Sequence, residues 1–198
     1  MTRAGFVDRH MEFTFTLKFR LTHRWSCGEH PGAARALAAA GVQLARQRRG
    51  ALRLEFLRAA SDGRVVIRQA IADIRRVIPM AVLAEAGPDY IGLTGLARLF
   101  GLSRQALRKL MVTRGGRFPS PVHEVHGAVW HLAEVLEWLD AMRLYRIDMQ
   151  LLEISRAAAQ VNVAVECQRM RAVRRHTDRL IELPRDIATL LRAAGLPV

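Results

Sequence analysis

The sequence predicts an α+β protein in which an antiparallel sheet with two helices is followed by short helices and then one long helix. Three observations lead to this prediction. Residues 1–90 contain runs of alternating apolar and polar residues, separated by two stretches with helical periodicity. Residues 91–140 change to short apolar-periodic segments around an extended piece. Residues 141–170 carry one long periodic pattern.

The first elements follow from local patterns. Residues 12–21 (EFTFTLKFRL) alternate phenylalanine and leucine with polar residues, which indicates a half-buried strand. The alanine-rich stretch that stops at Gly41 predicts a helix. Two further alternating runs, one with Val42 and Leu44 on the same side and one from Leu52, are joined by a polar turn and predict a hairpin.

A second helix and a last strand complete this half of the chain. Ser61 and Asp62 are N-cap candidates for a helix with an apolar stripe, and MAVLAEAGP after it indicates a short strand. The order strand, helix, strand, strand, helix, strand is that of the ferredoxin-like sandwich. Residues 1–90 are therefore predicted to be a ferredoxin-like domain for oligomerisation or sensing, and residues 88–91 a linker.

The charge of the chain indicates an acidic partner. Its 31 lysines and arginines against 18 aspartates and glutamates give a formal net charge of +13 at pH 7. Nucleic acid or an anionic membrane surface would suit such an excess. No apolar run in the sequence approaches the roughly 20 residues of a membrane span, and the N-terminus lacks a secretory pattern. We therefore expect a cytoplasmic protein with no membrane partner.

No sequence motif indicates catalysis or a cofactor. The sequence has no glycine-rich phosphate loop, GxSxG elbow or HExxH motif, and its N-terminal acidic residues are scattered. His23, Cys27 and His30 have metal-ligand intervals, but a zinc site normally needs four ligands, which favours an exposed loop. Cys27 and Cys167, the two cysteines, are expected to be reduced. We expect no enzymatic activity, no cofactor and no metal.

The stretch GLTGLARLFGLSRQALRKLM, residues 92–111, predicts two helices joined by a tight turn. Ala97 and Gly101 are the small residues at the crossing and the turn, and Thr94 and Ser103 are N-cap candidates. The expected inward positions are apolar, namely Leu96, Phe100, Leu102, Leu107 and Leu110. A helical hairpin with an arginine-rich exterior is the alternative interpretation.

The second helix of this pair has a face rich in hydrogen-bond donors. The residues predicted to face outward are Ser103, Arg104, Gln105, Arg108 and Lys109. In the major groove, arginine can bridge guanine N7 and O6, and glutamine can bridge adenine N6 and N7. No acidic residue occurs between residues 91 and 121, as phosphate binding requires. The pattern predicts a DNA-reading helix over residues 103–112.

Residues 93–139 resemble the winged helix-turn-helix of the MerR and phage-excisionase superfamily, especially its small AlpA-like regulators. After the helix pair, the resemblance rests on a Phe-Pro-x-Pro-Val segment, an aromatic residue closing a wing, and a helix ending in Trp-Leu. These places are filled by Phe118, Pro119, Pro121, Val122, Trp130, Trp138 and Leu139. The resemblance implies sequence-specific DNA binding, with the second helix in the major groove and a β-hairpin wing beside the backbone or minor groove.

The resemblance also implies roles for individual residues. It implies that Arg104, Gln105 and Arg108 contact the bases. It implies that most phosphate contacts are made by Ser103, Lys109, Arg114 and Arg117. In the wing, His123 and His126 stand where the family often has arginine or lysine, and Glu124 adds a negative charge. These histidines are candidate DNA contacts, with ordinary surface residues as the alternative.

The C-terminal part carries a heptad pattern. Its members, at steps of three and four, are Leu144, Ile147, Leu151, Ile154, Ala158, Val161 and Val165. The pattern predicts a helix over residues 141–170 that forms a homodimer through residues 144–165, with packing onto its own chain as the alternative. Residues 171–198 are expected to be a basic, partly ordered tail that adds non-specific DNA affinity.

Together, these features predict a sequence-specific DNA-binding transcriptional regulator of bacterial or phage type. In this hypothesis residues 91–140 read DNA, while residues 1–90 respond to an unknown effector or protein partner. The alternative is a protein-interaction adaptor, or an antitoxin-like module, whose helix pair binds a protein. A nuclease guided by the winged helix is a third and weaker hypothesis.

Overall fold

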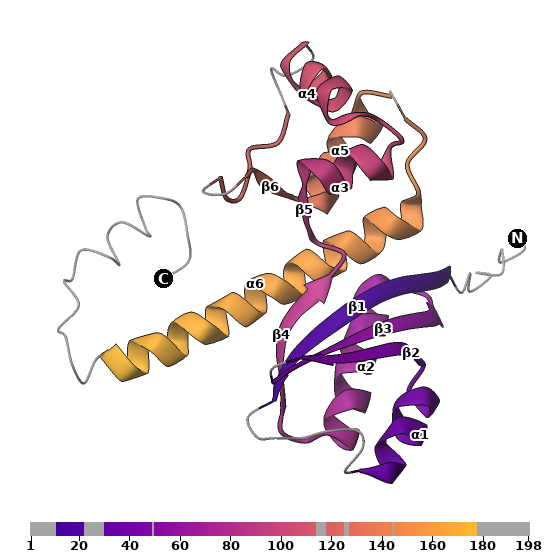
Figure 1. Cartoon of the computed structure of the whole chain (residues 1–198), viewed down its shortest axis with the longest axis vertical. Helices are drawn as coiled ribbons and strands as arrows, with labels where there is room; N and C mark the ends of the chain where they lie inside the picture. Colours follow the sequence, from indigo (N-terminus) through magenta and orange to yellow (C-terminus); the bar gives the residue numbers. More distant parts are fainter. Residues whose placement is uncertain are drawn as a thin grey trace, which may run out of the picture. The chain divides into compact units, whose positions relative to one another are not determined.

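The computed structural model describes residues 11–21, 30–48, 50–113, 118–124, 127–143 and 145–177 (Figure 1). The described part is a mixture of α-helices and antiparallel strands, so the predicted α+β class is compatible with the structure. The chain divides into two units, residues 1–162 and 163–198. The first unit contains all the strands described below and the proposed DNA-reading helices.

A four-stranded antiparallel sheet forms the N-terminal half of the first unit. Its strands are β1 (Met11–Leu21), β2 (Val42–Arg48), β3 (Ala51–Ala60) and β4 (Ala81–Gly87), in the order β2-β3-β1-β4. Helices α1 (Pro31–Ala39) and α2 (Gly63–Val77) connect them, and α2 packs on β1, β3 and β4 (Figure 1). The sequence order of strands and helices matches the prediction for residues 1–90.

The core of this half combines the period of two in the strands with the helical period of α2. Phe13, Phe15 and Phe19 of β1 are at most 1% exposed. Phe15 lies directly opposite Phe56 of β3, and their rings stack with centroids 4.9 Å apart. The buried residues of α2 are Gly63, Val66, Ile67, Ala70 and Ile74. Burial of each large side chain stabilises the fold by about 1.5–3 kcal/mol.

One part of the predicted hairpin is wrong in detail. Val42 lies opposite Phe56, but the register shifts before Leu44, which lies opposite Glu55 and is 39% exposed. The extra residue of this bulge reverses the alternation that follows it. Leu44 therefore lies on the face of the sheet away from the core, although its spacing from Val42 predicts the opposite.

Asp62, rather than Ser61, caps α2. Its carboxylate accepts hydrogen bonds from the backbone amides of Arg64, at 2.6 Å, and Val65, at 3.2 Å. Hydrogen bonds from the Arg64 side chain and then from the Arg64 amide lower the pKa of Asp62 below its ordinary value. The ionised cap therefore stabilises the folded chain, and this contribution is lost as the pH falls through the lowered pKa.

The substitution Asp62→Asn tests the charge of this cap, because asparagine retains the capping oxygen without the titration. We expect the variant to be less stable at pH 7 by about 0.5 kcal/mol. The difference should shrink as the pH falls through the lowered pKa of the wild-type carboxyl, because the cap then loses its charge. Urea unfolding across a series of acidic pH values measures it, with Glu12→Gln at the exposed end of β1 as the control. A difference that does not change with pH would contradict the assignment.

The long helix α6 (Met149–Thr177) begins later than predicted. The Asp148 carboxylate accepts hydrogen bonds from the amides of Gln150 and Leu151, which fixes the start of the helix. The predicted range 141–170 is therefore wrong at its start, since Ile147 precedes the helix, and Leu144 lies outside the described residues. The first residues of the predicted tail, 171–177, belong to α6, and residues 178–198 lie outside the described part.

Several heptad positions of α6 are buried within the chain itself, whereas Leu151 and Val161 are half-buried. Ile154 is 2% exposed and Ala158 is fully buried, as is Ser155 between them. At Gly63, where α2 begins, a Cβ atom would lie 3.3 Å from the carbonyl oxygen of Glu153, so α2 and α6 meet at close range. The structure therefore does not support the predicted homodimer through residues 144–165, since Ile147, Ile154, Ala158 and Val165 of that pattern are already buried.

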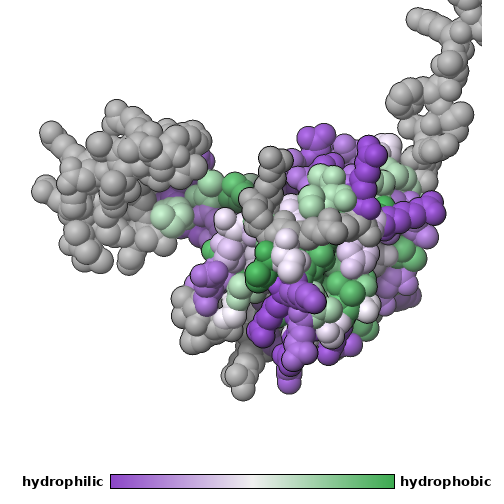
Figure 2. All heavy atoms as spheres, turned by 90° about the horizontal axis from the view of Figure 1, so that it is seen from above, coloured by the Kyte–Doolittle hydropathy of each residue, from purple (hydrophilic) through white to green (hydrophobic). Residues whose placement is uncertain are grey.

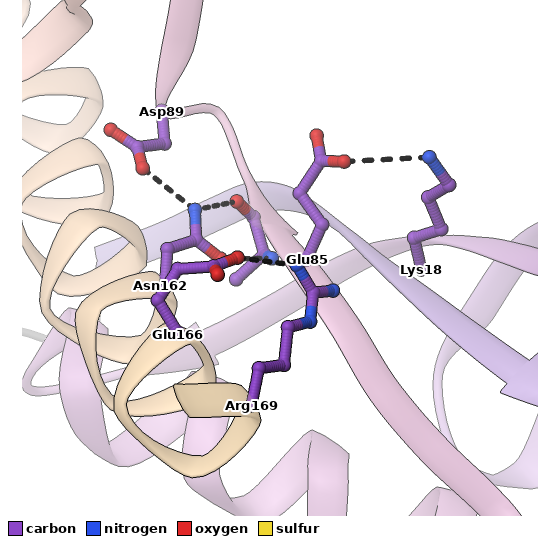
Figure 3. A network of polar contacts seen from close by, with 7 residues as sticks. Lys18, Glu85, Asp89, Asn162, Glu166 and Arg169 are labelled. Atoms are coloured by element: carbon purple, nitrogen blue, oxygen red, sulfur yellow. Dashed lines mark hydrogen bonds and ion pairs between the residues drawn. The ribbon is translucent and has the colours of Figure 1, made fainter. Parts of the chain in front are cut away.

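Asn162 attaches α6 to the edge of the sheet (Figure 3). Its side chain accepts a hydrogen bond from the amide of Ala86, at 2.7 Å, and donates to the carbonyl of the same residue, at 2.9 Å. It also donates to the carboxylate of Asp89, at 2.6 Å. Asn162 and Asp89 are both 3% exposed, so these hydrogen bonds satisfy groups that water does not reach freely.

We expect Asn162→Ala to destabilise the chain by about 3 kcal/mol, because it leaves buried groups of Ala86 and Asp89 without their partner. The free energy of unfolding in urea measures the loss. Gln160→Ala, at an exposed position of the same helix, is the control. If the two variants were equally stable, the Asn162 contacts would not hold the helix to the sheet.

Candidate nucleic-acid interface

The predicted helix pair follows a short strand. Strand β5 (Tyr90–Gly92) leads directly into α3 (Leu93–Leu99), and α4 (Arg104–Thr113) follows. Strand β5 pairs with β6 (Val129–His131), which leads into α5 (Leu132–Ala141). The predicted linker over residues 88–91 is therefore partly wrong, because Tyr90 and Ile91 belong to a strand. The sequence signal was too short, since β5 has only three residues.

The turn between α3 and α4 has a defined hydrogen-bond pattern. The Leu102 amide donates to the Ala97 carbonyl, at 2.8 Å, and the Gly101 amide donates to the Arg98 carbonyl, at 3.2 Å. These two bonds are those of a Schellman motif, which ends a helix with a residue in the left-handed region. Gly101 has φ of +64° and fills that position. Gly101 is thus required by the backbone of the turn, as predicted.

The two predicted N-caps have different outcomes. The Ser103 hydroxyl accepts a hydrogen bond from the Ala106 amide, at 3.1 Å, which confirms it as the cap of α4. For α3 the cap is Gly92, with no side-chain hydrogen bond, and Thr94 lies exposed inside the helix. The prediction for Thr94 is wrong because β5 passes into α3 two residues earlier than the pattern suggests.

The inward residues of the pair form a core with α5. Leu96, Ala97 and Leu107 are at most 3% exposed, while Phe100, Leu102 and Leu110 are partly buried against the same cluster. Phe118 packs edge-on against Trp130 and Trp138, with ring centroids 5.7 and 5.1 Å away. This packing fixes the orientation of α4 relative to α3 and α5.

The residues that follow α4 form part of a small loop. The Trp130 indole donates to the Pro119 carbonyl, at 3.1 Å. His123 pairs with Val129 in an isolated bridge, and the Val122 amide donates to the Val129 carbonyl, at 2.7 Å. His123 is exposed. Three other predicted contacts, Arg114, Arg117 and His126, lie outside the described residues.

The predicted contact residues that the structure describes on α4 all face solvent. Ser103, Arg104, Gln105, Arg108 and Lys109 are exposed, whereas Leu107 between them is 1% exposed. Helix α4 contains no acidic residue, and no ion pair involves its cations within the described ranges. The helix N-terminus adds a partial positive charge to this surface. We call these five residues the α4 face.

The described part of the chain shows neither a metal site nor a membrane span. No group of three or more histidine, cysteine, aspartate or glutamate residues within it is arranged to hold a metal ion. Among the predicted metal-ligand candidates, His23 and Cys27 lie outside the described residues, and His30 directly precedes α1. No helix of the part described is long and apolar enough to cross a membrane.

Comparison with protein-family models, curated proteins and solved structures found no match. A function can therefore be inferred only from the geometry and charge of the chain itself. In the α4 face, exposed donors, a helix N-terminus and a rigid support coincide.

We expect Gly101→Ala to destabilise the chain by about 1 kcal/mol, because alanine is strained at a positive φ. No heavy atom lies within 4 Å of an added Cβ, so the conformation alone accounts for the cost. Gly32→Ala is the matched control, since its added Cβ is also uncrowded and it lies in α1. The control should be neutral or stabilising by up to about 1 kcal/mol. Thermal unfolding distinguishes the two, and equal shifts would contradict the required turn.

Proposed function

We propose that the chain is a sequence-specific DNA-binding protein that regulates transcription, with α4 in the major groove. The observation that carries this proposal is the α4 face, a set of exposed donors without acidic residues on a helix fixed by a buried core. Arg104, Gln105 and Arg108 have the chemistry to read base edges. Ser103 and Lys109 lie beside them as phosphate contacts.

Two further features support a winged helix-turn-helix. The described residues 118–124 and 127–131 include the bridge between His123 and Val129 and lead into β6, as expected for a short wing. The strand order β2-β3-β1-β4 before it suits a ferredoxin-like domain. We propose that this domain receives a signal from an effector or a protein partner, and that the protein acts in the cytoplasm on the chromosome.

A protein-interaction adaptor is the second candidate. Its supporting observation is that Val112 of α4 is 83% exposed and Leu99 of α3 is 43% exposed. On the face seen in Figure 2, however, hydrophilic side chains lie between smaller apolar areas. A large continuous apolar patch would favour a protein partner more strongly. The cationic α4 face therefore makes DNA the better candidate.

The test is selection of binding sites from a random duplex library with the full chain, followed by gel-shift titration at about 150 mM salt, where non-specific binding is weak. We expect the triple variant Arg104→Ala, Gln105→Ala, Arg108→Ala to bind the selected site at least about 100-fold more weakly, since each good base contact contributes about 1–3 kcal/mol.

The control is Arg68→Ala, Gln69→Ala, Arg75→Ala, which removes the same residue types from exposed positions of α2. This variant should bind the selected site almost as well as the wild type. Equal affinities of the two triple variants, or a selection that enriches no sequence, would refute the proposed function. Circular dichroism of both variants establishes that each is folded.

A further inference from the structure

The four-stranded sheet has one face that carries α1 and α2 and another that does not. On strands paired in register, directly opposite residues share a face. Arg46, Arg53, Lys18 and Glu85 lie opposite one another across all four strands. The next outward row contains Arg48, Ala51 and Arg20, each two residues along its strand, and Val82, which is three residues along β4 because the register shifts there. We call these eight residues the basic rows.

The basic rows carry an excess of positive charge that the neighbouring acidic residues do not neutralise. Five of the eight residues are cations and one, Glu85, is an acid. Lys18 pairs with Glu85, at 3.5 Å, and Arg53 pairs with Glu55 of the adjacent row, at 3.8 Å. The exposed Arg20, Arg46 and Arg48 form no ion pair with a described residue.

The strand register places these positive charges directly opposite one another, which destabilises the sheet. Arg46 lies directly opposite Arg53, and Arg53 lies directly opposite Lys18. Like charges at directly opposed positions destabilise an antiparallel sheet. A bound polyanion would relieve this repulsion, so the arrangement suits a partner with regularly spaced negative charges.

The dimensions of the basic rows suit a nucleic-acid backbone. Four strands about 4.8 Å apart give a length of roughly 14 Å, and the rows are about 7 Å apart along the strands. One strand of duplex DNA places a phosphate every ~3.4 Å along the axis, so this length faces about four phosphates. The long arginine side chains can reach them from a flat surface.

The same face lacks the features that recognise unpaired bases. Proteins that bind single strands stack bases on exposed aromatic side chains. Here the phenylalanines of β1 and β3 are Phe13, Phe15, Phe19 and Phe56, and all are buried on the helix-covered face. The basic rows contain no aromatic residue. The chemistry therefore favours contact with phosphates rather than with bases.

We propose that the basic rows bind the phosphate backbone of duplex DNA, as a contact separate from the α4 face that contributes affinity without sequence preference. Arg20, Arg46 and Arg48 supply the charge that no described acid neutralises, and Lys18 and Arg53 complete the row. This contact does not require α4 to read bases, and it gives the N-terminal half of the chain a direct part in DNA binding.

The test uses the full chain with a fluorescent duplex of arbitrary sequence, and measures affinity by anisotropy across a series of salt concentrations. The variant Arg20→Gln, Arg46→Gln, Arg48→Gln should lower the slope of log affinity against log salt by about 2–3, since each lost phosphate contact contributes about 0.9. The matched control Arg35→Gln, Arg68→Gln, Arg75→Gln removes the same charge from exposed positions of α1 and α2. The control should leave the slope nearly unchanged.

A further variant separates loss of charge from loss of structure. Arg20→Lys, Arg46→Lys, Arg48→Lys retains the charges and should retain most of the slope, because lysine also contacts phosphates. The thermal midpoint of the glutamine variant should not fall, since the substitutions reduce like-charge repulsion in the sheet. Equal slopes for the glutamine variant and the α1–α2 control would overturn the proposal.

Competition and the α4 variant complete the design. Unlabelled single-stranded RNA or polyglutamate that competed better than duplex DNA would also overturn the proposal, in favour of another polyanion. The triple alanine variant of α4 retains the five cations of the basic rows, so adding Arg20→Gln, Arg46→Gln, Arg48→Gln to it should lower its salt slope on arbitrary DNA by the same amount as in the wild type. If the wild type shows no sequence preference, the proposed function is refuted but the proposal for the basic rows is not. If the variant Arg20→Gln, Arg46→Gln, Arg48→Gln has the salt slope of the wild type, only the proposal for the basic rows is refuted.

Discussion

The buried carboxylate of Asp89 is the point on which the other elements of the first unit depend. It accepts a hydrogen bond from Asn162 of α6, and it lies 2.6 Å from Nδ1 of His131 at the end of β6. Its backbone carbonyl also accepts from the amide of Leu132, where α5 begins. One residue between β4 and β5 thus ties the sheet, the β5–β6 pair and α6 together. A buried carboxylate is tolerated only with such partners.

The two edge strands of the sheet, β4 and β2, are protected in different ways. On β4, the Asn162 amide meets both backbone groups of Ala86 as a neighbouring strand would. On β2, the edge carries a bulge and the charged Arg46 and Arg48, features that discourage pairing with another chain. The arginines that protect this edge also extend the positive charge of the open face.

Elements governed by local periodicity could be predicted from the sequence, whereas contacts between distant residues could not. The alternation of residues 12–21 and the cap at Ser103 depend on neighbours in the chain, and both agree with the structure. The heptad pattern was ambiguous, because spacing alone does not distinguish a second copy from the chain's own core. Asn162 pairs with residues more than 70 positions away, so its role had no local signal beyond a polar side chain between Val161 and Val165.

The hydrogen bond from the Trp130 indole to the Pro119 carbonyl has a consequence for how this protein can diversify. It joins Pro119 to Trp130 of β6, and the ring of Phe118 packs edge-on against the same Trp130. Connecting segments tolerate sequence change better than the elements they join, so substitutions between Pro119 and Trp130 can alter the chemistry of the loop while the helices stay held by their own core. The loop is thus a site where a lineage can acquire new ligand preferences while α4 and its core stay as they are.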